Sequence, residues 1–170
     1  RTLINRLKQI APAIQSRGAA LMVEASVDVA VRGGADGVHL AFDRARVEEA
    51  VSRLAPDRMV GVAGLRSRDD AMTSGEFGCD YVMFGEPAPA RRAEGDVLPP
   101  FPAVVDRVSW WAQLFEVPVV GYAPDLDSVA ALAAAQADFI ALGDAVWSHA
   151  DGPAAAIVLA LAAIGQGAAA

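Results

Sequence analysis

The sequence predicts an α/β fold with a parallel sheet, of the TIM (β/α)8 barrel type. Short apolar runs rich in Val, Ile, Leu and Met alternate with Ala-rich amphipathic segments of helical spacing, and each run has the length of a strand buried on both faces. A helix stop, an Asp and a new apolar run recur in Gly33–Val38, Gly78–Val82 and Ala137–Ile140. Such regular βα repeats favour a barrel over a dinucleotide-binding sheet, and no G-x-G-x-x-G motif follows any expected strand.

The expected elements follow one another along the whole chain, and the first is a helix over Leu3–Gln15 with no strand before it. The expected strands are Ala19–Val23, Gly37–Leu40, Met59–Ala63, Tyr81–Phe84, Val117–Tyr122 and Phe139–Leu142. The further helices are Val27–Arg32, Ala45–Leu54, Ser67–Phe77, Ala103–Phe115, Leu126–Ala135 and Pro153–Ile164. Asp43, Ser67 and Asp125 are expected N-caps, and Pro153 suits a first helical position.

The strand count bears on how the barrel closes. A closed barrel of this type has eight strands, and the pattern gives only six. We therefore expect strands 3–8 in this chain, with the first two strands missing upstream of Arg1, or else an open barrel with unpaired edges. No linker or low-complexity block divides the sequence, which predicts one barrel domain over residues 1–170, incomplete at its N-terminus.

Composition excludes several classes of protein. Of the 170 residues 54% are hydrophobic, which is enough to fill a core and excludes a disordered tail. The net charge of −7 argues against a nucleic-acid binder or a cationic membrane peptide. The single cysteine, Cys79, excludes a disulfide scaffold and a Cys-rich zinc module. The longest apolar stretch, Pro153–Ile164, is too short to span a membrane, and we expect a cytoplasmic protein.

Four short motifs stand in a fixed order along the chain. They are Leu21–Ala30 (LMVEASVDVA), Gly34–Leu40 (GADGVHL), Asp80–Gly85 (DYVMFG) and Val117–Gly121 (VPVVG). Their order and spacing resemble the thiamine phosphate synthase family and its thiazole tautomerase relatives, whose motifs read LIINDRVDLA, GADGVHL, DYVGFG and VPVVA. The resemblance implies a TIM barrel of thiamine biosynthesis that couples hydroxymethylpyrimidine pyrophosphate with thiazole phosphate, with Mg²⁺ on the released pyrophosphate.

The chain departs from the family's motifs where the family binds metal and pyrophosphate. Glu24 and Ala25 replace an N-D pair that supplies a pyrophosphate contact and a magnesium ligand, and Ala25 has no metal-binding group. The acid of the family's GQED motif is also displaced, which leaves Asp43 as the expected metal ligand. The phosphate-binding T-x-T-K loop is lost, but Arg91 and Arg92 lie in its place and are expected to pair with phosphate.

The candidate site lies at the C-terminal ends of the expected strands, as in other barrels of this type. The backbone N–H groups of Gly143 and Ala145 fall at a helix start, where related barrels hold phosphate. Four acids form a potential ring that would bind a cation or a positively charged heterocycle, or else cap helices and face water. These acids are Glu24, Asp43, Glu86 and Asp144.

Three further side chains have two interpretations each. His39 is the only histidine on an expected strand, so it is either the acid/base of an isomerase or an interior histidine with satisfied hydrogen bonds. Cys79 begins a strand and is expected to be a small buried hydrophobe rather than a nucleophile. Trp111 fits an apolar stripe that packs on the sheet, whereas Trp110 lies off that stripe and suggests a subunit contact, hence a possible homodimer.

Three functions remain open from the sequence. The first is the synthase of thiamine biosynthesis, with Mg²⁺, although the loss of metal and pyrophosphate motifs argues against the usual activity. The second is a non-catalytic barrel that binds or senses a thiazole or pyrimidine phosphate without a metal. The third is a metal-independent isomerase that uses His39. All three take a small phosphorylated heterocycle as partner, with no nucleic acid and no membrane.

Overall fold

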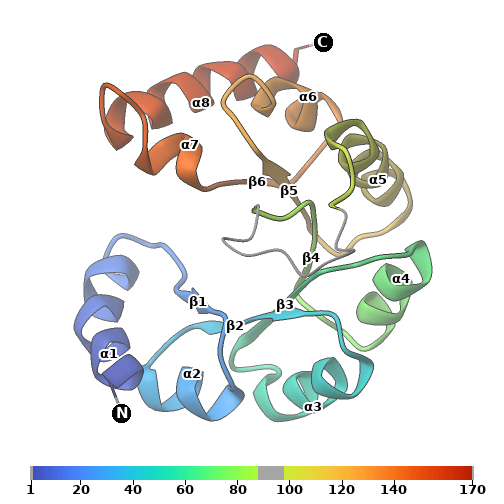
Figure 1. Ribbon diagram of the computed structural model, residues 1–170. Coiled ribbons are helices and arrows are strands. Elements are labelled where there is room, and N and C mark those ends of the chain that lie inside the picture. Colours follow the sequence, from blue (N-terminus) through green and yellow to red (C-terminus); the bar gives the residue numbers. More distant parts are fainter. Residues whose placement is uncertain (1, 88–97, 170) are drawn as a thin grey trace. The chain divides into compact units, whose positions relative to one another are not determined.

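Strands and helices alternate through the chain, as the sequence predicts. The structure is a computed structural model that describes residues 2–87 and 98–169 (Figure 1). The strands in these residues are β1 (Met22–Val23), β2 (Gly37–Ala41), β3 (Met59–Ala63), β4 (Tyr81–Phe84), β5 (Val119–Ala123) and β6 (Phe139–Leu142). The helices are α1 (Thr2–Gln15), α2 (Val27–Gly33), α3 (Arg44–Leu54), α4 (Arg68–Glu76), α5 (Phe101–Leu114), α6 (Val129–Ala134), α7 (Asp144–Trp147) and α8 (Pro153–Gly167).

The chain divides into two compact units, Arg1–Val82 and Met83–Ala170. In the first unit β1 pairs with β2, β2 with β3 and β3 with β4, and every pair is parallel. In the second unit β5 and β6 are parallel. Helices α1 to α4 lie along the outer side of the first unit's strands (Figure 1). The predicted α/β class with parallel strands is therefore confirmed, while the closed eight-stranded barrel and the single domain stay predictions.

Three aspartates each form the same pair of hydrogen bonds at the start of a strand. The Asp80 carboxylate accepts the N–H of Val60 at 2.7 Å, and the Asp80 N–H donates to the carbonyl of Val60 at 2.8 Å. Asp36 bonds Leu21 in the same two ways, and so does Asp138 with Val119. These are the aspartates of the recurring sequence motif, and their hydrogen bonds order the αβ turns.

The helix starts agree with two of the three expected N-caps. Asp43 accepts the N–H of Arg46, and Ser67 forms a capping box with Asp70. Asp125 is wrong as an N-cap, because its carboxylate accepts both the N–H and the hydroxyl of Ser128, at 2.9 and 2.6 Å. That turn delays the start of α6 to residue 129.

Of the differences from the expected elements, those at β1 and α7 have local reasons. β1 has two residues instead of the five expected, and the hydrogen bonds of Leu21 with Asp36 lie just before it. The four-residue helix α7 was not expected, because so short a segment shows no helical periodicity. Pro153 opens α8, as its fixed φ angle predicts.

The cores of the two units use β-branched and aromatic side chains. In the first unit Val38, Val60 and Val82 are at most 1% exposed. In the second unit the fully buried Trp111 stacks on Phe115 at a centroid distance of 4.1 Å, and its indole N–H donates to the Val117 carbonyl. The expected packing of Trp111 is confirmed.

Trp110 is less exposed than expected. It is half-buried, and its ring meets Trp111 and Phe115 edge-on at centroid distances of 5.8 and 5.4 Å. Trp110 thus packs against aromatic rings of its own chain. The subunit contact and the homodimer stay predictions.

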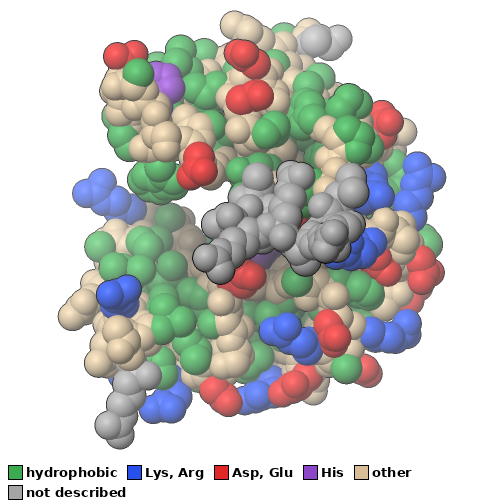
Figure 2. Space-filling view, in the orientation of Figure 1, with side chains coloured by type: hydrophobic (Ala, Val, Ile, Leu, Met, Phe, Trp, Pro, Cys, Tyr) green, Lys and Arg blue, Asp and Glu red, His purple; other side chains and the backbone are tan. Residues whose placement is uncertain are grey.

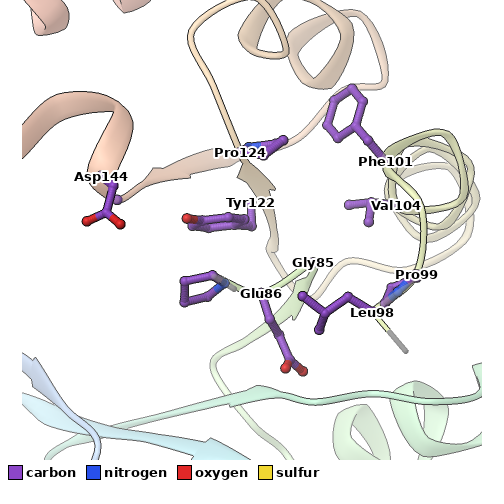
Figure 3. A pocket seen from close by; sticks show the side chains of 11 residues that line it. Gly85, Glu86, Leu98, Pro99, Phe101, Val104, Tyr122, Pro124 and Asp144 are labelled. Atoms are coloured by element: carbon purple, nitrogen blue, oxygen red, sulfur yellow. The ribbon is translucent and has the colours of Figure 1, made fainter. Parts of the chain in front are cut away.

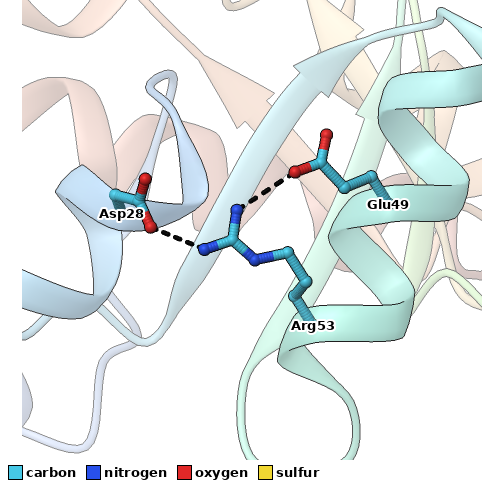
Figure 4. A network of polar contacts seen from close by, with 3 residues as sticks. All are labelled: Asp28, Glu49 and Arg53. Atoms are coloured by element: carbon cyan, nitrogen blue, oxygen red, sulfur yellow. Dashed lines mark hydrogen bonds and ion pairs between the residues drawn. The ribbon is translucent and has the colours of Figure 1, made fainter.

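The surface of the first unit carries mixed charges. Arg53 on α3 binds Asp28 on α2 at 2.5 Å and Glu49 at 3.0 Å (Figure 4), and its hydrogen bond with Asp28 is the main cause of its raised pKa. Lys and Arg are interspersed with Asp and Glu on the face shown in Figure 2. None of the helices in the described part of the chain is long and apolar enough to cross a membrane.

Candidate functional site

The acids predicted as a ring fall in both units of the fold. Glu24 and Asp43 follow β1 and β2 in the first unit, whereas Glu86 and Asp144 follow β4 and β6 in the second. All four side chains are exposed. The structure brings Glu86 and Asp144 to one pocket, described below.

A histidine and a tyrosine meet across a glycine in the first unit. His39, Gly61 and Tyr81 are register partners on β2, β3 and β4 and therefore share one face of the sheet. The His39 Nδ1 and the Tyr81 hydroxyl form a hydrogen bond of 2.8 Å, and the rings stack with centroids 5.8 Å apart. A Cβ on Gly61 would lie 1.9 Å from Cζ of Tyr81, so the tyrosine ring depends on residue 61 having no side chain.

The Tyr81 phenol keeps its proton far above neutral pH. Burial, followed by the charges of Asp80 and Cys79, raises the pKa of Tyr81 to about 12. A neutral phenol is available to donate to the ring nitrogen of His39. The half-buried, hydrogen-bonded His39 thus agrees with the interpretation as an interior histidine, and its catalytic role stays a prediction.

The described donors do not fit a magnesium site. Mg²⁺ takes near-octahedral oxygen ligands, including carboxylates held in place for it. The Asp43 carboxylate instead accepts the Arg46 N–H at 3.0 Å, where it caps α3. In residues 2–87 and 98–169 no group of three or more His, Cys, Asp or Glu side chains could hold a metal ion. The role of Asp43 as a metal ligand therefore stays a prediction.

A pocket of about 350 Å³ opens within the second unit (Figure 3). It lies at the carboxyl ends of strands, where barrels of this type bind their ligands. Its lining comes from the segments after β4, β5 and β6 and from the start of α5. These segments contribute residues 85–87, Leu98, Pro99, Phe101, Val104, Tyr122, Pro124, Gly143 and Asp144.

Tyr122 is the central aromatic surface of this pocket. A side chain on either of two glycines would crowd Tyr122. A Cβ on Gly143 would be 2.9 Å from the Tyr122 hydroxyl, and one on Gly85, which has φ +83°, would be 3.0 Å from Tyr122 Cβ. Figure 3 shows the hydroxyl end of Tyr122 toward Asp144 and the side chains of Leu98 and Val104 on the opposite side.

The pocket carries negative charge. The lining that the described residues 2–87 and 98–169 provide includes Glu86 and Asp144 and contains no Lys or Arg. Among the described residues neither carboxylate forms an ion pair. Partial burial, followed by the charge of Asp144, raises the pKa of Tyr122, so that its hydroxyl stays neutral.

The candidate phosphate-binding groups are placed only in part. Gly143 lines the pocket, and Ala145 is half-buried in α7. Arg91 and Arg92 lie outside the described residues. Binding of phosphate at these four positions, and of a substrate at Glu24 and Glu86, stays a prediction.

Sequence reasoning missed the aromatic partner of each candidate side chain. The sequence places Tyr81 only on a strand, because its position opposite Gly61 depends on the strand register that the structure shows. Tyr122 was named at a strand end, but nothing in its neighbours predicted the apolar wall of Leu98 and Val104. Cys79 was identified correctly as a buried side chain, and burial raises the pKa of its thiol to about 12, which keeps it unreactive.

The chain is similar to proteins of one family along most of its length. The family model described as "Thiamine monophosphate synthase" matches residues 1–146. A thiamine-phosphate synthase of Hyphomonas neptunium is 36% identical over 144 residues, which are 84% of this chain and 63% of that protein. One of Rhodospirillum centenum is 35% identical over 156 residues, which are 91% of this chain and 73% of that protein. The chain thus spans somewhat under two thirds of the first relative's length and somewhat more of the second's.

Solved structures show the same fold at lower sequence identity. Thiamine phosphate pyrophosphorylase from Pyrococcus furiosus matches with a TM-score of 0.78 and 21% identity, covering 98% of this chain and 78% of that one. 3-Hexulose-6-phosphate synthase from Salmonella typhimurium matches with a TM-score of 0.72 and 14% identity, covering 96% and 81%. At these identities the likeness concerns the fold alone.

Proposed function

Because the chain belongs to the thiamine monophosphate synthase family, we propose that it acts in thiamine biosynthesis as a thiamine phosphate synthase-like protein. The reaction would couple hydroxymethylpyrimidine pyrophosphate with thiazole phosphate and release pyrophosphate. The family match over residues 1–146 carries this proposal, and the pocket at the strand ends supports it. We further propose that the whole protein closes an eight-stranded barrel.

In this reaction the pocket would have one role, and Arg91 and Arg92 would have another. The pocket beside Tyr122 would hold a heterocyclic ring, since its walls are apolar and aromatic. Arg91 and Arg92 would pair with the phosphate groups, because guanidinium groups form paired hydrogen bonds with phosphate oxygens. Glu24 would contact the second substrate. A divalent cation would offset the charge of the leaving pyrophosphate, but the described donors do not assemble a site for it, so no step is assigned through the metal.

The synthase activity is tested with the full-length protein and both phosphorylated substrates, with and without Mg²⁺. The expected result is thiamine phosphate in the complete mixture, measured by chromatography, and none when either substrate is omitted. Arg91→Ala and Arg92→Ala should each raise KM for a phosphorylated substrate. Absence of product in the complete mixture, with the protein folded by circular dichroism, would reject the synthase proposal.

A second candidate is a non-catalytic protein that binds a thiazole or pyrimidine phosphate. Two observations favour it: Ala25 stands where the family has a metal ligand, and Asp43 caps a helix. Calorimetry would then show saturable binding that needs no Mg²⁺ and leads to no turnover. A metal-independent isomerase remains a prediction that rests on His39. His39→Ala would have to abolish such an activity without unfolding the protein.

A further inference from the structure

We propose that Tyr81 is a positioning residue for His39. Its hydroxyl donates to Nδ1 and holds the imidazole in the form that carries its proton on Nε2, so that His39 acts on a ligand as a hydrogen-bond donor and not as a base. This role goes beyond the proposed function, on which it rests only for the assay of turnover.

The pair lies on the face of the first unit's sheet that is opposite its apolar core. Neighbouring residues of a strand point to opposite faces, and the valines next to the pair, Val38 and Val82, are buried in the core. Helices α1 to α4 lie along the outer side of these strands (Figure 1). His39 and Tyr81 are both half-buried, so the pair is not sealed inside the core. This face of the sheet can therefore present the imidazole to a ligand.

Close packing fixes the geometry of the pair. The Tyr81 ring lies so close to β3 that a Cβ on Gly61 would be 1.9 Å from its Cζ atom. The imidazole stacks on this ring with the centroids 5.8 Å apart and the planes at 19°. Both contacts restrict rotation of the two rings, which keeps Nδ1 of His39 directed at the Tyr81 hydroxyl.

The hydrogen bond between the two side chains fixes where the protons lie. The Tyr81 hydroxyl is 2.8 Å from Nδ1 of His39, and no other described residue forms a hydrogen bond with that hydroxyl. Its proton is therefore used on Nδ1, because an unprotonated ring nitrogen accepts. Burial, followed by the charges of Asp80 and Cys79, raises the pKa of Tyr81 to about 12, so the phenol keeps this proton near neutral pH. The proton of the neutral imidazole then lies on Nε2.

The direction of this hydrogen bond decides what His39 can do. With the imidazole proton on Nε2, that nitrogen donates, and the lone pair of Nδ1 is occupied by the Tyr81 hydroxyl. In the opposite form Nδ1 would donate to Tyr81, and Nε2 would carry a basic lone pair. An isomerase that uses neutral His39 as a base needs that opposite form. A relay of the Tyr81 proton through the imidazole would leave a half-buried tyrosinate, which the raised pKa of Tyr81 opposes.

The position of the proton is measured by ¹⁵N NMR on the full chain at about pH 8, where histidine is ordinarily neutral. The sequence has two histidines, so the signals of His39 are compared with those of His149 in the second unit. The protonated ring nitrogen of His39 should be Nε2, and its Nδ1 should be unprotonated. A proton on Nδ1 would overturn the inference.

The two tyrosines of the chain supply a matched pair of variants. Tyr81→Phe removes the hydroxyl but keeps the ring beside Gly61, and it should shift the Nδ1 signal of His39 while the signals of His149 stay in place. Tyr122→Phe removes the other tyrosine hydroxyl, which lies in the second unit, and should leave the His39 signals unchanged. An unchanged Nδ1 signal in Tyr81→Phe, or an equal change in Tyr122→Phe, would also overturn the inference.

Turnover tests the role of His39 as a donor. His39→Gln keeps an amide N–H donor but has no basic nitrogen, whereas His39→Leu keeps neither. In thiamine phosphate formation His39→Leu should lose about tenfold in kcat/KM, the effect of one hydrogen bond, and His39→Gln should lose less. A catalytic base would instead make both variants lose about 10²–10⁴-fold. Equal turnover by the two variants would overturn the donor role. If the unchanged protein forms no thiamine phosphate, the synthase proposal alone fails, and the nitrogen signals decide the role of Tyr81.

Discussion

At the scale of single residues, two glycines leave the space that an aromatic side chain occupies at each candidate site. Gly61 leaves room for Tyr81 to bond His39, and Gly143 leaves room for Tyr122. Sequence alone identified His39 as either interior or catalytic. It did not identify the tyrosine beside it, because the pairing depends on strand register, which joins residues 42 positions apart.

Substituting Gly61 should destabilise the first unit. In Gly61→Ala the new methyl group would overlap the Tyr81 ring, and such overpacking costs about 1–3 kcal/mol of unfolding free energy. Gly165→Ala is the matched control, because no atom lies within 4 Å of its Cβ position on α8, and it should stabilise by about 0.5–1 kcal/mol. Urea denaturation measures both. Equal stability of the two variants would contradict the close packing at Gly61.

Tyr81 and Tyr122 should lose their hydroxyl protons at a higher pH in the folded protein than in the unfolded chain. Burial is the main cause of the raised pKa of both, and that of Tyr81 is about 12. The folded state therefore favours the neutral Tyr81 phenol. This contribution to stability is complete below pH 10, the ordinary pKa, and is lost as the pH rises from 10 to 12. Tyrosinate absorbance measures the titration, and a Tyr81 titration near pH 10 in the folded protein would contradict it.

At the scale of elements, three αβ turns share one construction. In each turn the Asp carboxylate accepts the backbone N–H of one residue, and the Asp N–H donates to the carbonyl of that same residue. The recurring order of helix stop, Asp and apolar run made these turns predictable, because a local motif specifies them. The delayed start of α6 was not predictable in the same way, since Asp125 and Ser128 form a turn that competes with helix capping.

Removing one of these aspartates should weaken the fold. Asp80→Ala leaves the N–H of Val60 without its partner and should cost about 1–3 kcal/mol, whereas Asp80→Asn retains an accepting oxygen and should cost less. Asp57→Ala removes an exposed carboxylate that forms no hydrogen bond with any described residue, and its effect should stay within about 0.5 kcal/mol. Thermal unfolding compares the three. A cost for Asp57→Ala equal to that for Asp80→Ala would show that charge alone matters.

At the scale of the whole molecule, sequence periodicity predicted the succession of strands and helices better than it predicted the pocket. Strand lengths and helix faces follow local patterns, and three of the six strands have the expected bounds. The pocket combines Leu98, Tyr122 and Asp144, which no local pattern connects. The family resemblance predicted the ends of the strands as the place of the site, but this chain's own side chains decide its charge.

The second unit exposes much of α8, although that helix is almost entirely apolar. Val158 and Leu161 are 66% and 62% exposed, whereas Ala160 between them is 3% exposed. Val158→Glu should therefore reduce self-association, measured by light scattering, and change unfolding free energy by no more than about 0.5 kcal/mol. Ala160→Glu would bury an unpaired carboxylate and should destabilise by several kcal/mol, about 3 or more. Unfolding by Val158→Glu would contradict the exposure of this face.

The aspartate turns affect how a protein of this fold can evolve. Their hydrogen bonds lie at the amino ends of the strands. The residues that line the pocket lie at the carboxyl ends, after the last residues paired in the sheet. Selection can therefore change which molecule is bound at the carboxyl ends of the strands, where Ala25 stands in place of a metal-binding acid of the family, while the hydrogen bonds at the amino ends preserve the fold.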